Sequence, residues 1–105
     1  MEISINEEHF YESQAEMLGY LARSIKQTLQ EKEVDEDSLY DITGDLMFAV
    51  CTVIDGSAVM GTEEKPVLPY LTFSKSLEEK ENLVASASGS SLHEIAYGCV
   101  EELFE

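Results

Sequence analysis

Apolar residues recur at steps of three and four along the first third of the chain, the spacing that places them on one face of an α-helix. This series consists of Phe10, Met17, Leu18, Leu21, Ile25 and Leu29. Asn6 precedes it with a side chain suited to a helix N-cap, and Glu7 and Glu8 follow where negative charge favours a helix start. The pattern predicts a helix over residues 7–32.

A second helical period follows a short acidic connector. Its apolar positions are Leu39, Ile42, Leu46, Ala49, Val50 and Val53. Ser38 and Asp41 form a Ser-x-x-Asp start signal, and Gly56 stands where a glycine commonly ends a helix. We predict a helix over residues 39–54. Because residues 46–54 are rich in β-branched side chains, a buried strand is the alternative for that stretch.

Strand-like patterns appear in the second half of the chain. Residues 67–74 resemble a strand that Pro69 confines to a sheet edge or a bulge, because proline has no N–H to donate. Residues 83–88 alternate two sets of side chains, which suits a second strand and a hairpin. A lone hairpin is marginal in water. An edge strand could therefore pair with a second copy of the chain, which leaves a homodimer open.

The last segment carries the clearest local signal. Ser91 and Glu94 form a Ser-x-x-Glu capping box, and the apolar positions after it are Leu92, Ile95, Ala96, Cys99, Val100 and Leu103. This pattern predicts a helix over residues 92–104. The whole chain, residues 1–105, is then one α+β domain with two N-terminal helices, a β-hairpin and a C-terminal helix.

Charge narrows the classes of partner. The chain has 22 acidic and 6 basic residues, with a formal net charge of −16. A field of this sign repels nucleic acid and anionic membranes and attracts basic protein surfaces. No apolar run is long enough to cross a bilayer, and the N-terminus lacks the features of a signal peptide. We therefore expect a cytoplasmic protein without a nucleic-acid or membrane partner.

The two cysteines, Cys51 and Cys99, lie far apart without a Cys-x-x-Cys spacing. Both fall within apolar segments, where a free thiol behaves as a small hydrophobic side chain. We interpret them as buried, reduced thiols.

Two short motifs suggest chemistry without completing it. Ser90, Ser91 and His93 are neighbours in the sequence, but no Gly-x-Ser-x-Gly elbow accompanies them. Tyr97 stands where a zinc protease would have its second histidine. Residues 86–91 are rich in glycine and serine and could cradle an anion, but they contain no lysine or arginine. We expect no catalytic residue and no cofactor.

Closely spaced carboxylates raise the question of a metal. They are Asp35, Asp37, Asp41 and Asp45. An EF-hand loop is excluded, because Leu39 and Tyr40 stand where a ligand and a glycine belong. Asp41 and Asp45 are one helical turn apart and could share a cation, but we favour a solvated acidic face and predict no metal site.

We hypothesise a non-catalytic module that engages a basic protein partner, in the manner of immunity proteins, antitoxins and DNA mimics. Tyrosine is favoured at interface hot spots, so Tyr40 could anchor such a partner. The expected partner-binding residues are Glu31, Glu33, Asp35, Glu36, Asp37, Tyr40, Asp41 and Asp45. The alternative is a small cytoplasmic housekeeping or regulatory homodimer whose acidity serves solubility.

Overall fold

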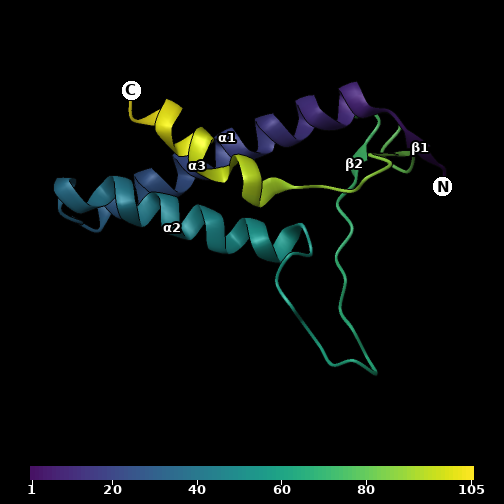
Figure 1. Ribbon diagram of the computed structural model, residues 1–105. Coiled ribbons are helices and arrows are strands. Elements are labelled where there is room, and N and C mark those ends of the chain that lie inside the picture. The colour runs from purple at the N-terminus through teal and green to yellow at the C-terminus, as the bar shows by residue number, and fades with distance from the viewer.

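Two long helices form an antiparallel pair in the first half of the chain (Figure 1). The computed structural model describes residues 1–105, and in it α1 is Glu7–Glu31 and α2 is Glu36–Ile54. The Asn6 side chain caps α1 by accepting a hydrogen bond of 3.1 Å from the backbone N–H of His9. The first predicted helix is confirmed. The alternative of a strand at the end of the second is wrong.

The turn between α1 and α2 is tighter than the sequence suggests. Glu33 adopts a left-handed backbone with φ of 59°, and the hydrogen bond from the N–H of Val34 to the carbonyl of Leu29 closes the end of α1. The N-cap of α2 is Asp35 rather than Ser38. Asp35, Glu36 and Asp37, which we expected in an acidic connector over residues 31–37, therefore lie at the start of α2, where the helix dipole favours negative charge.

The third helix, α3 (Leu92–Leu103), follows its predicted range closely and lies against both α1 and α2. One apolar cluster joins all three helices, because each contributes its regularly spaced apolar face. Its fully buried members are Leu18 and Ala22 of α1, Met47 and Cys51 of α2, and Leu92, Ala96 and Val100 of α3.

A small mixed sheet closes one end of the helices (Figure 1). Its strands are β1 (Ile3–Ile5), β2 (Phe73–Ser74) and β3 (Leu83–Ala85), in the order β1-β3-β2. The predicted hairpin is confirmed as the antiparallel pair β2–β3, although both strands are shorter than expected. The third strand comes from the N-terminus of the same chain and pairs in parallel with β3, so the sheet does not need a strand from a second copy.

Residues 56–72, here called the arm, leave the body of the protein as a long loop (Figure 1). Near its tip, Gly61 and Pro66 form an isolated antiparallel bridge. The predicted strand over residues 67–74 is therefore wrong for most of its length, since only its last two residues enter the sheet. None of the helices has both the length and the apolar character needed to cross a membrane.

Candidate functional site

A row of aromatic rings, here called the aromatic seam, follows the line where α2 meets α3. Phe48 and Tyr97 are stacked with ring centroids 5.5 Å apart, and Tyr40 meets Phe104 edge to face at 5.3 Å. Gly44 makes this packing possible, because a Cβ atom there would lie 2.9 Å from Cε1 of Tyr97. The seam is accessible to a partner, since Tyr40, Phe48 and Tyr97 are each 37–43% exposed.

Carboxylates accompany the rings. The hydroxyl of Tyr97 donates a hydrogen bond of 3.1 Å to Oδ1 of Asp45. This hydrogen bond, together with partial burial, raises the pKa of Tyr97. Asp41 and Asp37 precede Asp45 at intervals of one helical turn, and all three are exposed. The seam thus presents aromatic faces and negative oxygen atoms side by side.

One ring of the seam already contacts a positively charged side chain of the same chain. The ammonium group of Lys26, on α1, lies 4.4 Å from the centroid of the Phe104 ring. Such a contact is the attraction expected between a positive charge and the negative face of an aromatic ring. At the opposite end, the Phe48 ring meets the His93 ring edge to face at 6.1 Å.

The predicted partner-binding residues are all exposed, and they lie on α2 and on the turn that joins it to α1. Glu31 ends α1, and Glu33 and Asp35 lie in the turn that follows. The members that the structure places on α2 are Glu36, Asp37, Tyr40, Asp41 and Asp45. Of these, Tyr40 and Asp45 contact seam residues directly.

Three further seam residues were missed by the sequence analysis: Phe48, Tyr97 and Phe104. A signal for them exists, since each is an aromatic residue close in sequence to acidic residues, on a helix or at its end. It becomes specific only when α2 and α3 are brought together.

Asp55 and His93 form a second polar cluster where α2 ends and α3 begins. Oδ2 of Asp55 accepts hydrogen bonds from the backbone N–H of His93 at 3.0 Å and from its ring Nδ1 at 2.5 Å. The predicted capping box at Ser91 does not form, because the Ser91 side chain makes no cap hydrogen bond. The carboxylate of Asp55, at the C-terminal end of α2, accepts the hydrogen bond from the first turn of α3 instead.

This cluster is well suited to hold a negative charge. The Asp55 side chain is fully buried, and burial opposes ionisation. Hydrogen bonds from the backbone and ring of His93 and from Ser57 outweigh that effect and lower the pKa of Asp55 to about 2. Asp55 therefore stays ionised at neutral pH and ties the end of α2 to the start of α3.

The same cluster resembles a Ser-His-Asp triad in composition but not in geometry. The hydroxyl of Ser57 lies 2.9 Å from Nδ1 of His93, the same nitrogen that Asp55 contacts. In a hydrolytic triad the serine meets the other ring nitrogen, which takes its proton. The arrangement is that of a helix cap. The sequence neighbours Ser90 and Ser91 make no hydrogen bond to His93.

The Gly-Ser stretch at residues 86–91 does bind an anion, but that anion is part of the chain. Glu7 accepts a hydrogen bond of 2.7 Å from the hydroxyl of Ser86 and one of 2.8 Å from the backbone N–H of Ala87. These two hydrogen bonds lower the pKa of Glu7. The donors that could have cradled a phosphate instead hold the start of α1 against the loop after β3.

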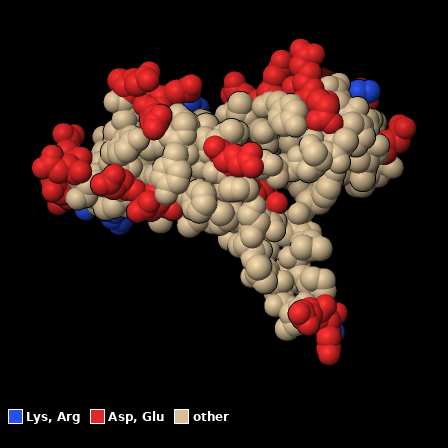
Figure 2. Space-filling model, in the orientation of Figure 1, with Lys and Arg blue, Asp and Glu red and all other residues tan.

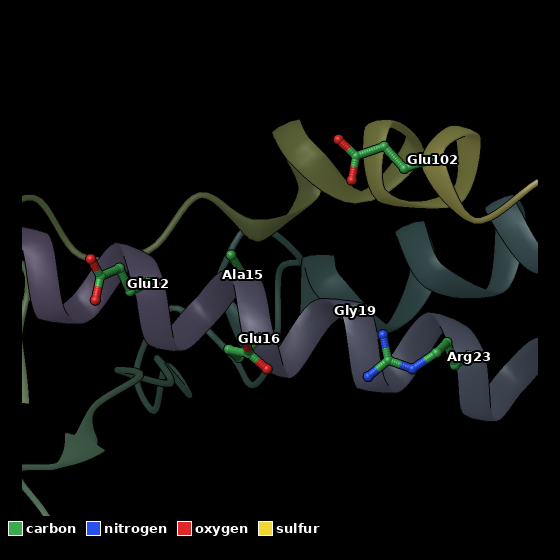
Figure 3. A pocket seen from close by; sticks show the side chains of 6 residues that line it. All are labelled: Glu12, Ala15, Glu16, Gly19, Arg23 and Glu102. Carbon is green, nitrogen blue, oxygen red and sulfur yellow. The ribbon is translucent and has the colours of Figure 1, made fainter. Parts of the chain in front are cut away.

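A shallow groove of about 550 Å³ lies between α1 and α3 (Figure 3). Ala15 and Gly19 form its floor, and Glu12, Glu16, Arg23 and Glu102 surround it. The three carboxylates lie apart rather than converging on one point (Figure 3). No group of three or more histidine, cysteine or acidic side chains is arranged to hold a metal ion anywhere in the structure.

Both cysteines are free, with Cys51 buried and Cys99 half-buried. Burial and, to a lesser extent, the negative charge of Asp55 raise the pKa of Cys51 to about 11. Burial also raises the pKa of Cys99. Since the thiolate is the reactive form, the structure suppresses the nucleophilicity of both side chains. The prediction of buried thiols is confirmed in full for Cys51 and in part for Cys99.

Comparisons of the chain with models of known protein families, with curated proteins and with solved structures found no match. The interpretation of the seam therefore depends on its own chemistry. It combines exposed rings, exposed carboxylates and one cation already bound to a ring.

Proposed function

We propose that the chain is a non-catalytic binding module that engages an arginine-bearing basic protein surface through the aromatic seam. The observation that carries this proposal is the pairing of Tyr97 with Asp45 beside the stacked ring of Phe48. A guanidinium group can stack on an aromatic face while its N–H groups reach a carboxylate. Rings and carboxylates held side by side are complementary to that side chain.

Burial and position support the same conclusion. The seam rings are partly exposed, whereas Met47 of α2 and Leu92 of α3 are fully buried. Rings held rigidly by stacking lose little conformational freedom when a partner binds, so more of the contact energy goes into binding.

The net charge of −16 serves this module by steering. Acidic atoms are spread over the visible face of the body and appear again at the tip of the arm (Figure 2). A field of one sign accelerates the encounter with an oppositely charged partner more than it tightens the final complex. We assign the acidic residues of the α1–α2 turn, from Glu31 to Asp35, to this long-range role, and the seam to recognition.

The free thiols support a reducing compartment as the place of action, and we propose the cytoplasm. A small homodimer whose acidity serves only solubility is the second candidate function. It would need an uncharged contact surface, because two copies of this chain repel each other strongly.

Binding of oligoarginine and oligolysine peptides of equal length tests the recognition chemistry. We expect oligoarginine to bind more tightly at equal peptide charge, because lysine cannot make the planar contacts that arginine makes. Binding should weaken steeply as salt is raised to about 0.5 M, where exposed charges are screened. Fluorescence anisotropy of labelled peptides measures both effects.

A pair of charge-reversal variants locates the surface. Asp41→Lys with Asp45→Lys should slow association about tenfold at low salt and remove the preference for arginine. Glu63→Lys with Glu64→Lys, at the tip of the arm, makes the same change in net charge away from the seam and should keep that preference. Equal loss of the preference in both variants, or no preference in the unmodified chain, would falsify the proposal.

A further inference from the structure

The arm carries large apolar and aromatic side chains that are mostly exposed. Val59 is 99% exposed, Leu68 74% and Tyr70 59%. In Figure 2 the stretch of the arm between the body and the tip, here called the shaft, shows no acidic or basic atoms, and these atoms appear again only at the tip. A continuous apolar projection of this kind is typical of an interaction site rather than of free surface.

Charged residues are almost absent from this part of a highly charged chain. Residues 46–74 contain only Asp55, Glu63, Glu64 and Lys65, whereas 27% of the whole chain is charged. The Asp55 side chain is fully buried, and the other three occupy the tip. The shaft of the arm is therefore an uncharged surface through which two chains of charge −16 can approach each other.

The protein also exposes more surface than a monomer of its size. Its accessible surface is 7228 Å², whereas a compact monomer of 11.7 kDa exposes about 5,900 Å². Its radius of gyration is 15.6 Å, against about 13 Å for a compact chain of this length. The excess of roughly 1,300 Å² is larger than the roughly 800 Å² that each partner buries in a standard interface.

The backbone of the arm is open as well. The N–H groups of Leu68, Tyr70, Leu71 and Thr72 donate no backbone hydrogen bond within the chain, although the Tyr70 hydroxyl donates one to the carbonyl of Ser86. Such a row of free donors in an extended segment is a template for pairing with another extended segment.

We propose that the arm is a homodimerisation element, in which the arms of two copies pack against each other in antiparallel orientation. A two-fold axis makes the uncharged, apolar surface complementary to itself. Antiparallel packing also places the two acidic tips about one arm length apart, roughly 20 Å, which exceeds the Debye length at physiological salt. This inference is independent of the proposed function, because it uses a different surface and the opposite dependence on salt.

Sedimentation equilibrium tests the proposal. We expect the unmodified chain to sediment with twice its mass of 11.7 kDa. The dimer should be strengthened at about 1 M salt, because repulsion between the two acidic bodies is screened. Leu68→Glu should weaken association about a hundredfold or more, since it places a carboxylate in the apolar contact. Val59→Glu should act in the same way.

Leu77→Glu is the matched control. Leu77 is 83% exposed but lies in the turn between β2 and β3, so the variant adds the same charge outside the arm. It should remain a dimer. Circular dichroism should show all three variants folded, because each replaces an exposed side chain.

A monomeric unmodified chain at all salt concentrations would overturn the inference, and so would equal dissociation of Leu68→Glu and Leu77→Glu. A dimer that persists in both arm variants would place the contact elsewhere. The oligoarginine assay separates this result from the proposed function, since the monomeric Leu68→Glu chain should still bind the peptide.

Discussion

Asp55 shows how one buried carboxylate can organise two helices. Its backbone ends α2, while its side chain satisfies the first turn of α3 and orients the His93 ring. The energetic contribution follows from its pKa, which is about 2 in the folded protein against an ordinary value of 3.8. That difference corresponds to about 2 kcal/mol of stability at neutral pH.

The stability that Asp55 supplies should therefore depend on pH in a defined window. A group whose pKa is lowered by folding stabilises the protein fully above its ordinary pKa. This contribution is lost as pH falls from about 4 towards about 2. We expect Asp55→Asn to lower the free energy of unfolding by about 2 kcal/mol at neutral pH and to flatten its decline between those pH values. Urea denaturation at a series of pH values measures both.

Asp41→Asn is the control for this prediction, because it removes one exposed carboxylate from the same helix. Its effect should stay within about 0.5 kcal/mol. Similar losses in the two variants would show that net charge, rather than the cap, explains the result.

The turn between α1 and α2 is the element that departs most from an ideal design. Glu33 occupies the left-handed position that glycine usually fills after a helix, with φ of 59°. Its negative charge also lies near the C-terminal end of α1, which the helix dipole disfavours. Both effects reduce stability, and both follow from an acidic residue that we assign to electrostatic steering.

Glu33→Gly should therefore stabilise the protein, by about 1 kcal/mol. Glu33→Ala separates the two causes, because it removes the charge but keeps a Cβ atom in the left-handed conformation. We expect the alanine variant to gain only a few tenths of a kcal/mol. Thermal and denaturant unfolding of both variants measures the difference, and equal stability of the two would mean that backbone strain contributes nothing.

The sequence predicted the helices well because each buries a regularly spaced apolar face, and that period survives in the fold. Helix starts were harder. Ser38 and Ser91 both look like caps, but Asp35 occupies the N-cap position of α2, and the carboxylate of Asp55 accepts the hydrogen bond at the start of α3. The strand β1 left no signal, because its three residues are all exposed and therefore show no alternation of burial. Pairing with β3, some 80 positions away, creates it.

At the scale of the whole molecule, composition indicated an acidic surface but could not show that it contains an aromatic seam and an uncharged arm. The seam is formed by residues about 50 positions apart in the chain, such as Asp45 and Tyr97, so no local pattern contains it. The uncharged arm is different, because its lack of charge is visible in the sequence. That this uncharged segment extends away from the body is visible only in the structure (Figure 1).

The excess of carboxylates over basic groups predicts that the stability of the fold increases with salt. Attractive pairs are few, since the closest lysine–carboxylate contact is Lys75 with Glu79, at 3.6 Å between exposed side chains. Repulsion among carboxylates therefore dominates the electrostatic energy of the folded state. Raising NaCl from about 0.05 to about 0.5 M should increase the free energy of unfolding, by on the order of 1 kcal/mol. Urea denaturation at fixed protein concentration measures this change without adding ions.

Two controls separate screening from other effects of salt. KCl should act like NaCl, because screening depends on ionic strength, whereas sulfate should add a further gain through its exclusion from protein surface. The Glu63→Lys, Glu64→Lys chain carries less net negative charge and should gain less from either chloride. A protein that lost stability as chloride rose would instead depend on attractive ion pairs. Its acidic surface would then be a network of interactions within the fold rather than a field directed at a partner.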